Sequence, residues 1–414
     1  MRKADRLLRL CRRETRWRIN SSLLNVPRMR CHREEWMKPA VFGLVAALAL
    51  GTSFFPALAE MPPVPTEQDR VLAENGDIYA QFRIAWAYFT GKGAKQDDAE
   101  AFRWFQKSAE GGNVPAQYNL AAMLMEGRGV ARNEVDAVRW FRRAAESGHA
   151  IAQYELAQKY FKGEGVKPNI EEALRWYRLS AAQKFPLAQF KLGLLYATGQ
   201  GVSRDDEVAA RWYRNASEGG YAAAQFNLAI MYLQGQGVAQ DRAAAFDLFK
   251  QAAENGDKTA QLNVGLMYVS GTGVAEDQVA AARWFRTAAD TGDAAGQYNL
   301  ALMYSDGRGV ERDAKEAVRL YTLSAEQGYV LAQHNLGVAY ATGTDVDRDP
   351  AAAFGWFMKA AEQGHAKAQF NVAQAYVEAN GVDKDLKAAA LWYGKAAAQG
   401  MSEAQQALDA LPKD

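Results

Sequence analysis

The stretch from Asn113 to Gly148 decides the fold of this chain. It reads NVPAQYNLAAMLMEGRGV over residues 113–130 and ARNEVDAVRWFRRAAESG over residues 131–148. In its first half, residues at i, i+3, i+4 and i+7 form one helix face: Gln117, Leu120, Ala121 and Leu124. This spacing predicts a helix over about Ala116 to Glu126. Gly127 then ends the helix, because glycine readily adopts the left-handed backbone of a helix C-terminus.

The second half of the stretch predicts another helix, over about Glu134 to Ser147. Asn133 stands at its N-cap, where a short side-chain acceptor satisfies a free backbone N–H. Three equivalent caps in other units are followed three residues later by a glutamate, which predicts capping boxes. These glutamates are Glu100, Glu172 and Glu316. The apolar face of the helix is formed by Ala137, Trp140, Phe141, Ala144 and Ala145.

The same unit recurs along the chain with a period of 36 residues. One glutamine marks the register without insertion or deletion: Gln81, Gln117, Gln153, Gln189, Gln225, Gln261, Gln297, Gln333, Gln369 and Gln405. Nine full units run from about Gly76 to Gly400, and a half unit follows. One hairpin cannot bury both of its faces, whereas stacked hairpins can. The sequence therefore predicts an all-α protein, an α-solenoid superhelix of about nine helix-turn-helix repeats over residues 76–411.

Some turns lack the expected glycine. Lys184, Asp345 and Ala379 stand where most units have one. The missing glycines either mark places where the superhelix bends or reflect neutral drift of the sequence.

The N-terminal region differs from the repeats in composition. The whole chain of 414 residues has a formal net charge of +1. Residues 1–38, however, are strongly basic, residues 39–59 carry no charge, and the remainder is mildly acidic. The apolar run 41–50 followed by Ala57-Leu58-Ala59 has the form of a secretory signal peptide over residues 37–59, with cleavage expected after Ala59. Residues 1–36 then look like an extension from a mispredicted gene start.

An uncleaved membrane anchor is the alternative, since residues 41–59 approach the length that spans a bilayer. Either interpretation predicts repeats that are periplasmic or secreted. Both cysteines, Cys11 and Cys31, precede the signal. A processed chain would therefore have no disulfide, thiol catalysis or cysteine metal site. Residues 60–75 read as a proline-rich linker and an N-terminal cap.

The repeat resembles a known family. The residues Ala-Gln-Tyr-Asn-Leu-Ala, Met-Tyr, Gly-x-Gly-Val and Ala-Ala-Glu-x-Gly are similar to the Sel-1-like repeats, a tetratricopeptide-like class. Residues 295–310 match this pattern closely, with Gly296 in place of the usual alanine. The resemblance implies a scaffold or adaptor that binds a partner protein, such as an envelope signalling or polysaccharide-assembly protein. One exported subgroup has a disulfide in each repeat, and this chain departs from it.

Candidate chemistry is sparse. The three histidines beyond the signal, His149, His334 and His365, lie in different units without partners for catalysis, so structural roles are expected. The glycine turns follow helices rather than strands and do not form a nucleotide fingerprint. The register glutamines should be buried and bonded to backbone. The recurrent tryptophans should fill the core; glycan stacking would need exposed rings.

A stripe of amides and methionines is the candidate partner surface. Its amides are Asn119, Asn227, Asn263, Asn299, Asn335 and Asn371, and its methionines are Met123, Met231, Met267 and Met303. In the first helix of each unit these positions should border the concave groove, where amides would bind the backbone of an extended peptide and methionines would adapt to its side chains. The alternative is that each asparagine only bonds the neighbouring repeat. Arg83, Glu155 and Lys191 replace it in three units, which favours the groove.

These observations predict a protein-binding scaffold or regulator of the bacterial cell envelope. We expect no enzyme activity, no catalytic, cofactor or metal site, and no nucleic-acid partner; a membrane is involved only if the signal stays uncleaved. Two alternatives remain: an envelope enzyme acting on cell-wall or β-lactam substrates, and a glycan-binding module in polysaccharide export.

Overall fold

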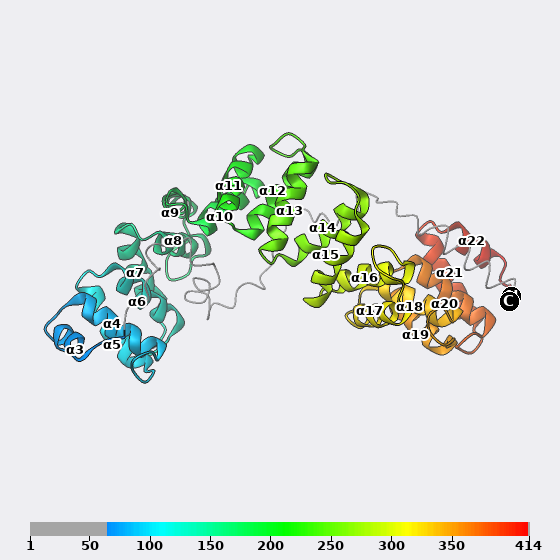
Figure 1. The fold of residues 1–414 in the computed structure, drawn as a ribbon, viewed down its shortest axis with the longest axis horizontal. Helices are drawn as coiled ribbons and strands as arrows, with labels where there is room; N and C mark the ends of the chain where they lie inside the picture. Colours follow the sequence, from blue (N-terminus) through cyan, green and yellow to red (C-terminus); the bar gives the residue numbers. More distant parts are fainter. Residues whose placement is uncertain (1–63, 413–414) are drawn as a thin grey trace. The chain divides into compact units, whose positions relative to one another are not determined.

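The computed structural model describes residues 64–412, and every regular element in that range is an α-helix. The described residues form two compact units, 64–241 and 242–412, which are treated separately below. The expected extension, signal peptide and cysteines lie outside the described residues. In each unit consecutive helices pack against one another in chain order (Figure 1), which confirms the all-α repeat architecture.

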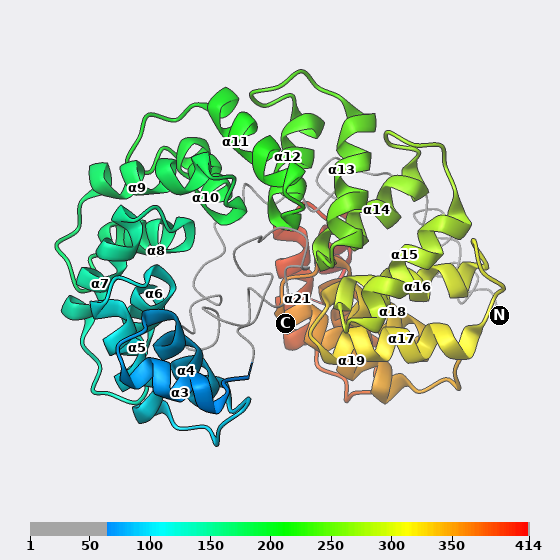
Figure 2. The same cartoon turned by 60° about the vertical axis from the view of Figure 1, so that its left-hand side comes forward.

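The first unit contains one short helix and nine helices of 13 residues. They are α3 (Glu67–Glu74), α4 (Ile78–Thr90), α5 (Asp98–Glu110), α6 (Val114–Glu126), α7 (Glu134–Glu146), α8 (Ala150–Lys162), α9 (Ile170–Ala182), α10 (Pro186–Thr198), α11 (Asp206–Glu218) and α12 (Ala222–Gln234). We call the even-numbered helices, which carry the register glutamine, helices A, and the odd-numbered ones helices B. In Figure 2, α6, α8 and α10 lie along the inner side of a curved row, and α7, α9 and α11 lie outside them.

The second unit continues the alternation and ends in a short helix A. Its helices are α13 (Arg242–Glu254), α14 (Lys258–Ser270), α15 (Gln278–Asp290), α16 (Ala294–Asp306), α17 (Ala314–Glu326), α18 (Val330–Thr342), α19 (Pro350–Glu362), α20 (Ala366–Glu378), α21 (Leu386–Ala398) and α22 (Ser402–Asp409). No helix within residues 64–412 has the length and apolarity needed to cross a membrane.

Helix boundaries follow the caps. α6 begins at Val114, two residues before the expected start, because the Asn113 side chain caps it and accepts a hydrogen bond from the Ala116 N–H. Asn133 caps α7 as predicted.

The predicted capping boxes of α5, α9 and α17 are wrong. The N–H of each cap already donates to a tyrosine carbonyl of the preceding helix, as Asp97 does to Tyr88 at 3.0 Å. The three glutamates pair instead with an arginine one turn further on: Arg103, Arg175 and Arg319.

The register glutamines hold successive hairpins together, as expected of buried amides. In eight repeats the side-chain Nε2 donates to a carbonyl of the preceding helix B at 3.0–3.4 Å. In four repeats a second glutamine, at the C-cap of the same repeat's helix B, donates to the Oε1 of the register glutamine at 2.8–2.9 Å: Gln183, Gln327, Gln363 and Gln399. Both bonds occur together at Gln153, Gln333 and Gln369, and we call this three-helix chain of hydrogen bonds the glutamine relay.

Helix B supplies the bulk of the core. The recurrent aromatic ring and the alanine four residues before it are almost completely buried, as for Tyr213 and Ala209, both 0% exposed. This confirms the expected burial of Tyr213. Small residues of helix A allow close approach: a side chain at Gly193 would lie only 2.7 Å from the Tyr213 ring.

Candidate partner-binding surface

The asparagines of the expected stripe share one position of helix A, which in the last two full repeats contacts the preceding helix A; we call it the seam position. Four of them are only 3–7% exposed: Asn119, Asn227, Asn263 and Asn299. Asn335 and Asn371, in α18 and α20, are half-buried. The amide groups that a partner would reach most readily are therefore those of the last two full repeats.

The asparagine side chains make two kinds of hydrogen bond. Asn119, Asn263 and Asn299 each donate to the carbonyl four residues earlier in their own helix, at 2.8 Å. Asn335 instead donates to the hydroxyl of Tyr298 in the preceding repeat at 3.5 Å, and Asn371 Nδ2 lies 3.4 Å from Nε2 of His334 in its own preceding repeat. The last two therefore act partly as the stacking alternative expects, and a binding role for the stripe stays a prediction.

The methionines of the stripe are less accessible than expected. Met123, Met231, Met267 and Met303 are 0–2% exposed. They lie four residues beyond the asparagines, on the side of helix A that faces the core. Met123, for example, belongs to the same buried cluster as Phe105. A partner bound to this conformation would not contact them, because neighbouring helices already cover their side chains.

Charged residues replace the asparagine in α4, α8 and α10, and their surroundings differ. Arg83 forms an ion pair with Asp69 of α3. Lys191 lies with its ammonium 4.4 Å from the centre of the Phe161 ring. Glu155 is half-buried and has no hydrogen bond or ion pair within residues 64–412.

Burial dominates the electrostatics of Glu155. Desolvation raises the pKa of this carboxyl, against the attraction of Lys159 and Lys162. Lys159, one helical turn away, instead places its ammonium 2.7 Å from Glu164. The sequence shows that Glu155 breaks the asparagine pattern, but it does not show that the nearest lysine pairs elsewhere.

The histidines have structural roles, as expected. His149 and His365 are N-caps of α8 and α20, and the Nδ1 of each accepts a backbone N–H at 3.2 Å. His334 and His365 lie ring against ring, with centroids 4.7 Å apart. Burial lowers the pKa of both His149 and His334 to about 4.

The recurrent tryptophans are mostly half-buried rather than fully buried. Cationic side chains lie over five of them at 3.8–5.1 Å from a ring centre: Trp104, Trp140, Trp176, Trp356 and Trp392. A ring covered by a cation is not an open platform for a sugar.

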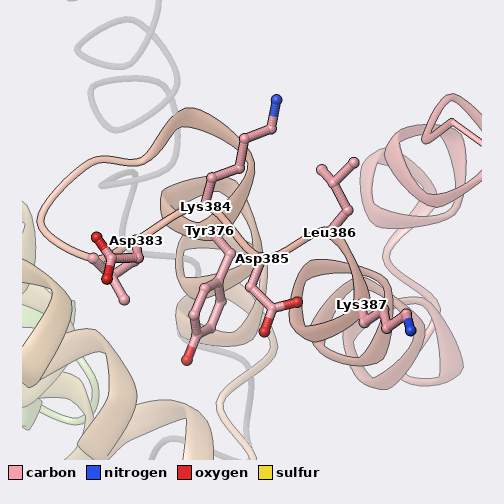
Figure 3. A pocket seen from close by; sticks show the side chains of 7 residues that line it. Tyr376, Asp383, Lys384, Asp385, Leu386 and Lys387 are labelled. Carbon is pink, nitrogen blue, oxygen red and sulfur yellow. The ribbon is translucent and has the colours of Figure 1, made fainter.

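A cavity of about 480 Å³ lies at the turn between α20 and α21, lined by Tyr376 and residues 382–387 (Figure 3). Asp385 faces this space in the picture, but its carboxylate caps α21 by accepting the Ala388 N–H. No group of three potential metal-ligating side chains occurs in the described part of the chain. The cavity thus holds no such group of metal ligands.

Comparison with known proteins identifies the repeat. The Sel1 repeat model matches nine consecutive segments: residues 78–113, 114–149, 150–185, 186–221, 222–257, 258–293, 294–329, 330–365 and 366–401. No curated protein matches the chain.

Two solved structures are similar over most of the chain. The first is c5321, described as a protective antigen of uropathogenic Escherichia coli strains with an SLR fold. It is 39% identical, with 82% of this chain and 73% of that chain covered and a TM-score of 0.74. The second is a Sel1 repeat protein from Oxalobacter formigenes, 30% identical, with 79% and 93% covered and a TM-score of 0.60. Nine adjacent matches and these two likenesses agree, and the chain belongs to the Sel1 repeat family.

Proposed function

We propose that this protein is a scaffold of the bacterial cell envelope that binds a partner protein along the inner side of its helices A. Sel1 repeat proteins are generally protein-interaction scaffolds. The observation that carries the proposal is the seam position itself: asparagine, arginine, glutamate and lysine occur there on one repeated backbone. Side chains that vary in charge within an unchanged fold suit recognition better than packing.

The envelope location rests on the signal-like segment 37–59, with the repeats periplasmic or secreted after cleavage at Ala59. The accessible amides of Asn335 and Asn371 support backbone recognition, because an amide both donates and accepts a hydrogen bond. An envelope enzyme has little support, since no nucleophile–base or paired-carboxylate motif stands out in the sequence. A glycan-binding module has less support than a protein-binding scaffold, because cations cover most of the recurrent tryptophans.

The test is a pull-down of the mature protein from envelope extract, followed by binding measurements with the identified partner. Asn299, Asn335 and Asn371 are changed together to alanine, and Arg139, Arg175 and Arg211 on the exposed faces of helices B serve as the matched triple control. We expect partner affinity to fall only for the asparagine variant, while its melting temperature stays close to that of the wild type. Unchanged affinity, or a loss that accompanies unfolding, would contradict binding by the seam.

A further inference from the structure

Glu155 is the seam residue whose charge is least compensated. It stands in α8 at the position that asparagine occupies in six other repeats. Arg83, the charged residue at the same position in α4, has Asp69 as its partner. Glu155 has no such partner among the described residues, since Lys159 pairs with Glu164.

A half-buried carboxylate without an ion pair reduces the stability of the folded chain, because burial removes hydrating water and the attraction of Lys159 and Lys162 does not outweigh that loss. Asparagine at this position would avoid that cost, as it does in α6 and α12. A carboxylate at this position therefore suits a ligand that brings a positive charge.

The charge of Glu155 reaches two tyrosines of helices A. Its charge acts on the phenols of both Tyr118 in α6 and Tyr154 in α8, and raises the pKa of each beyond the larger effect of burial. A hydrated metal ion fits less well, since hard cations require several oxygen ligands and Glu155 offers a single carboxylate.

We propose that Glu155, at the seam position of α8, binds an arginine or lysine side chain of an extended segment of the partner protein. This inference rests on the proposed function, because it assigns the chemistry of one position on the helices A of the first unit. By selecting the basic residue, Glu155 fixes the position of that segment on helices A of the first unit.

The test uses a phage-displayed library of random linear peptides selected on the full chain. Three proteins are compared: the wild type, Glu155→Asn, and Glu171→Asn, which removes an exposed carboxylate from the outer helix α9. The first substitution installs the residue that equivalent repeats already hold, so the fold should be retained. Glu155→Gln provides a second neutral variant of nearly the original size.

We expect peptides selected by the wild type and by Glu171→Asn to be enriched in one arginine or lysine at a fixed position. Both Glu155 variants should lose that enrichment, and the selected peptides should bind them at least about tenfold more weakly. Their melting temperatures should equal or exceed that of the wild type, which a purely structural role for Glu155 would not produce.

Two results would overturn the inference in different ways. Peptides that bind the wild type without a basic residue, or that keep it with Glu155→Asn, would refute the role of Glu155 and leave the scaffold function intact. If the wild type enriches no peptide, the recognition of extended segments fails, and the proposed function fails with it.

Discussion

The third repeat, residues 150–185, and the sixth, residues 258–293, have the same backbone and different side chains at equivalent positions. Each has two helices of 13 residues, a register glutamine bonded to the preceding helix B, and a fully buried ring, Tyr177 or Phe285. The differences lie at the edges of this framework. They concern the helix A cap, the seam, the helix B C-cap and the residue after it.

The edge positions of the two repeats follow different physical rules. The cap is His149 in the third repeat and Asp257 in the sixth, and the seam residue is Glu155 or Asn263. In the third repeat the register glutamine has a second hydrogen bond, from Gln183, which the sixth repeat lacks in the described part of the chain. The third repeat also has a carboxylate that is unpaired within residues 64–412, Glu155, where the sixth has the neutral Asn263. The shared positions therefore carry stability, and the variable ones are where pH response and specificity can differ between repeats.

The largest effect should come from removing the shared ring. Tyr177→Ala and Phe285→Ala should each lower the free energy of unfolding by roughly 3–5 kcal/mol, because both side chains are fully buried. Denaturant titration measures this, with the exposed Gln406→Ala in α22 as control. A loss in only one of the two repeats would contradict their equivalence. An equal loss in the control would contradict the assignment of the effect to burial of the ring.

The histidine at the N-cap of α8 predicts that the stability of the third repeat depends on pH. The pKa of His149 is about 4 in the folded chain, below the value of about 6.5 expected when unfolded. The unfolded state therefore takes up the proton first, and the stability from the neutral cap is present above about pH 6.5 and lost as the pH falls towards 4. Protonation also removes the Nδ1 acceptor of the Ala152 N–H.

The matched variant is His149→Asn, which copies the Asn113 cap of α6. The wild type should lose up to about 3 kcal/mol more stability than the variant between pH 6.5 and 4, the upper bound for a side chain that is not fully buried. Denaturant titrations at several pH values measure the difference. Parallel pH profiles for the two proteins would show that the cap does not carry the response.

The glutamine relay can be tested by exchanging the helix B C-cap residues of the two repeats. Gln183 donates to Gln153 Oε1 in the third repeat, whereas Thr291 bonds its own helix and Gln261 Oε1 is buried without a partner among the described residues. Thr291→Gln should raise the free energy of unfolding by about 1 kcal/mol, and Gln183→Thr should lower it by roughly 1–2 kcal/mol. Shifts of the same sign in the two variants would refute the relay.

Much of this framework could be predicted from the sequence. The glutamine at every 36th residue set the register, and the prediction that buried amides bond backbone is confirmed by the bond from Gln153 to the Ala145 carbonyl. The capping boxes failed because Asp97 already donates to Tyr88, a contact across a turn that local spacing does not reveal.

The candidate surface was harder to predict. Helical periodicity placed Met267 beside the asparagine stripe, but it does not say which neighbouring helix covers that side of helix A. The isolation of Glu155 depends on the choice of Lys159 between two carboxylates. Such a choice is made by side-chain rotamers in the packed repeat, and it leaves no trace in sequence spacing.

The smallest expected effect concerns the residue that follows the helix B C-cap. Lys184 in the third repeat has a φ of 61°, and Gly292 in the sixth has 83°, so both lie in the left-handed region. This conformation costs a residue with a Cβ roughly 1–2 kcal/mol. Glycine avoids that cost, but part of its advantage is offset by the larger conformational entropy that it loses on folding. Lys184→Gly should therefore raise the free energy of unfolding by up to about 1 kcal/mol.

Gly292→Lys is the reverse exchange and should lower the free energy of unfolding by a similar amount. A Cβ at Gly292 would meet no atom within 4 Å, so backbone conformation alone decides the result. Denaturant titration of the two single variants and of the double variant measures both effects, which should cancel in the double variant. If Lys184→Gly destabilises the chain, then the missing glycine is part of the packing of the third repeat, and the drift interpretation of this position fails.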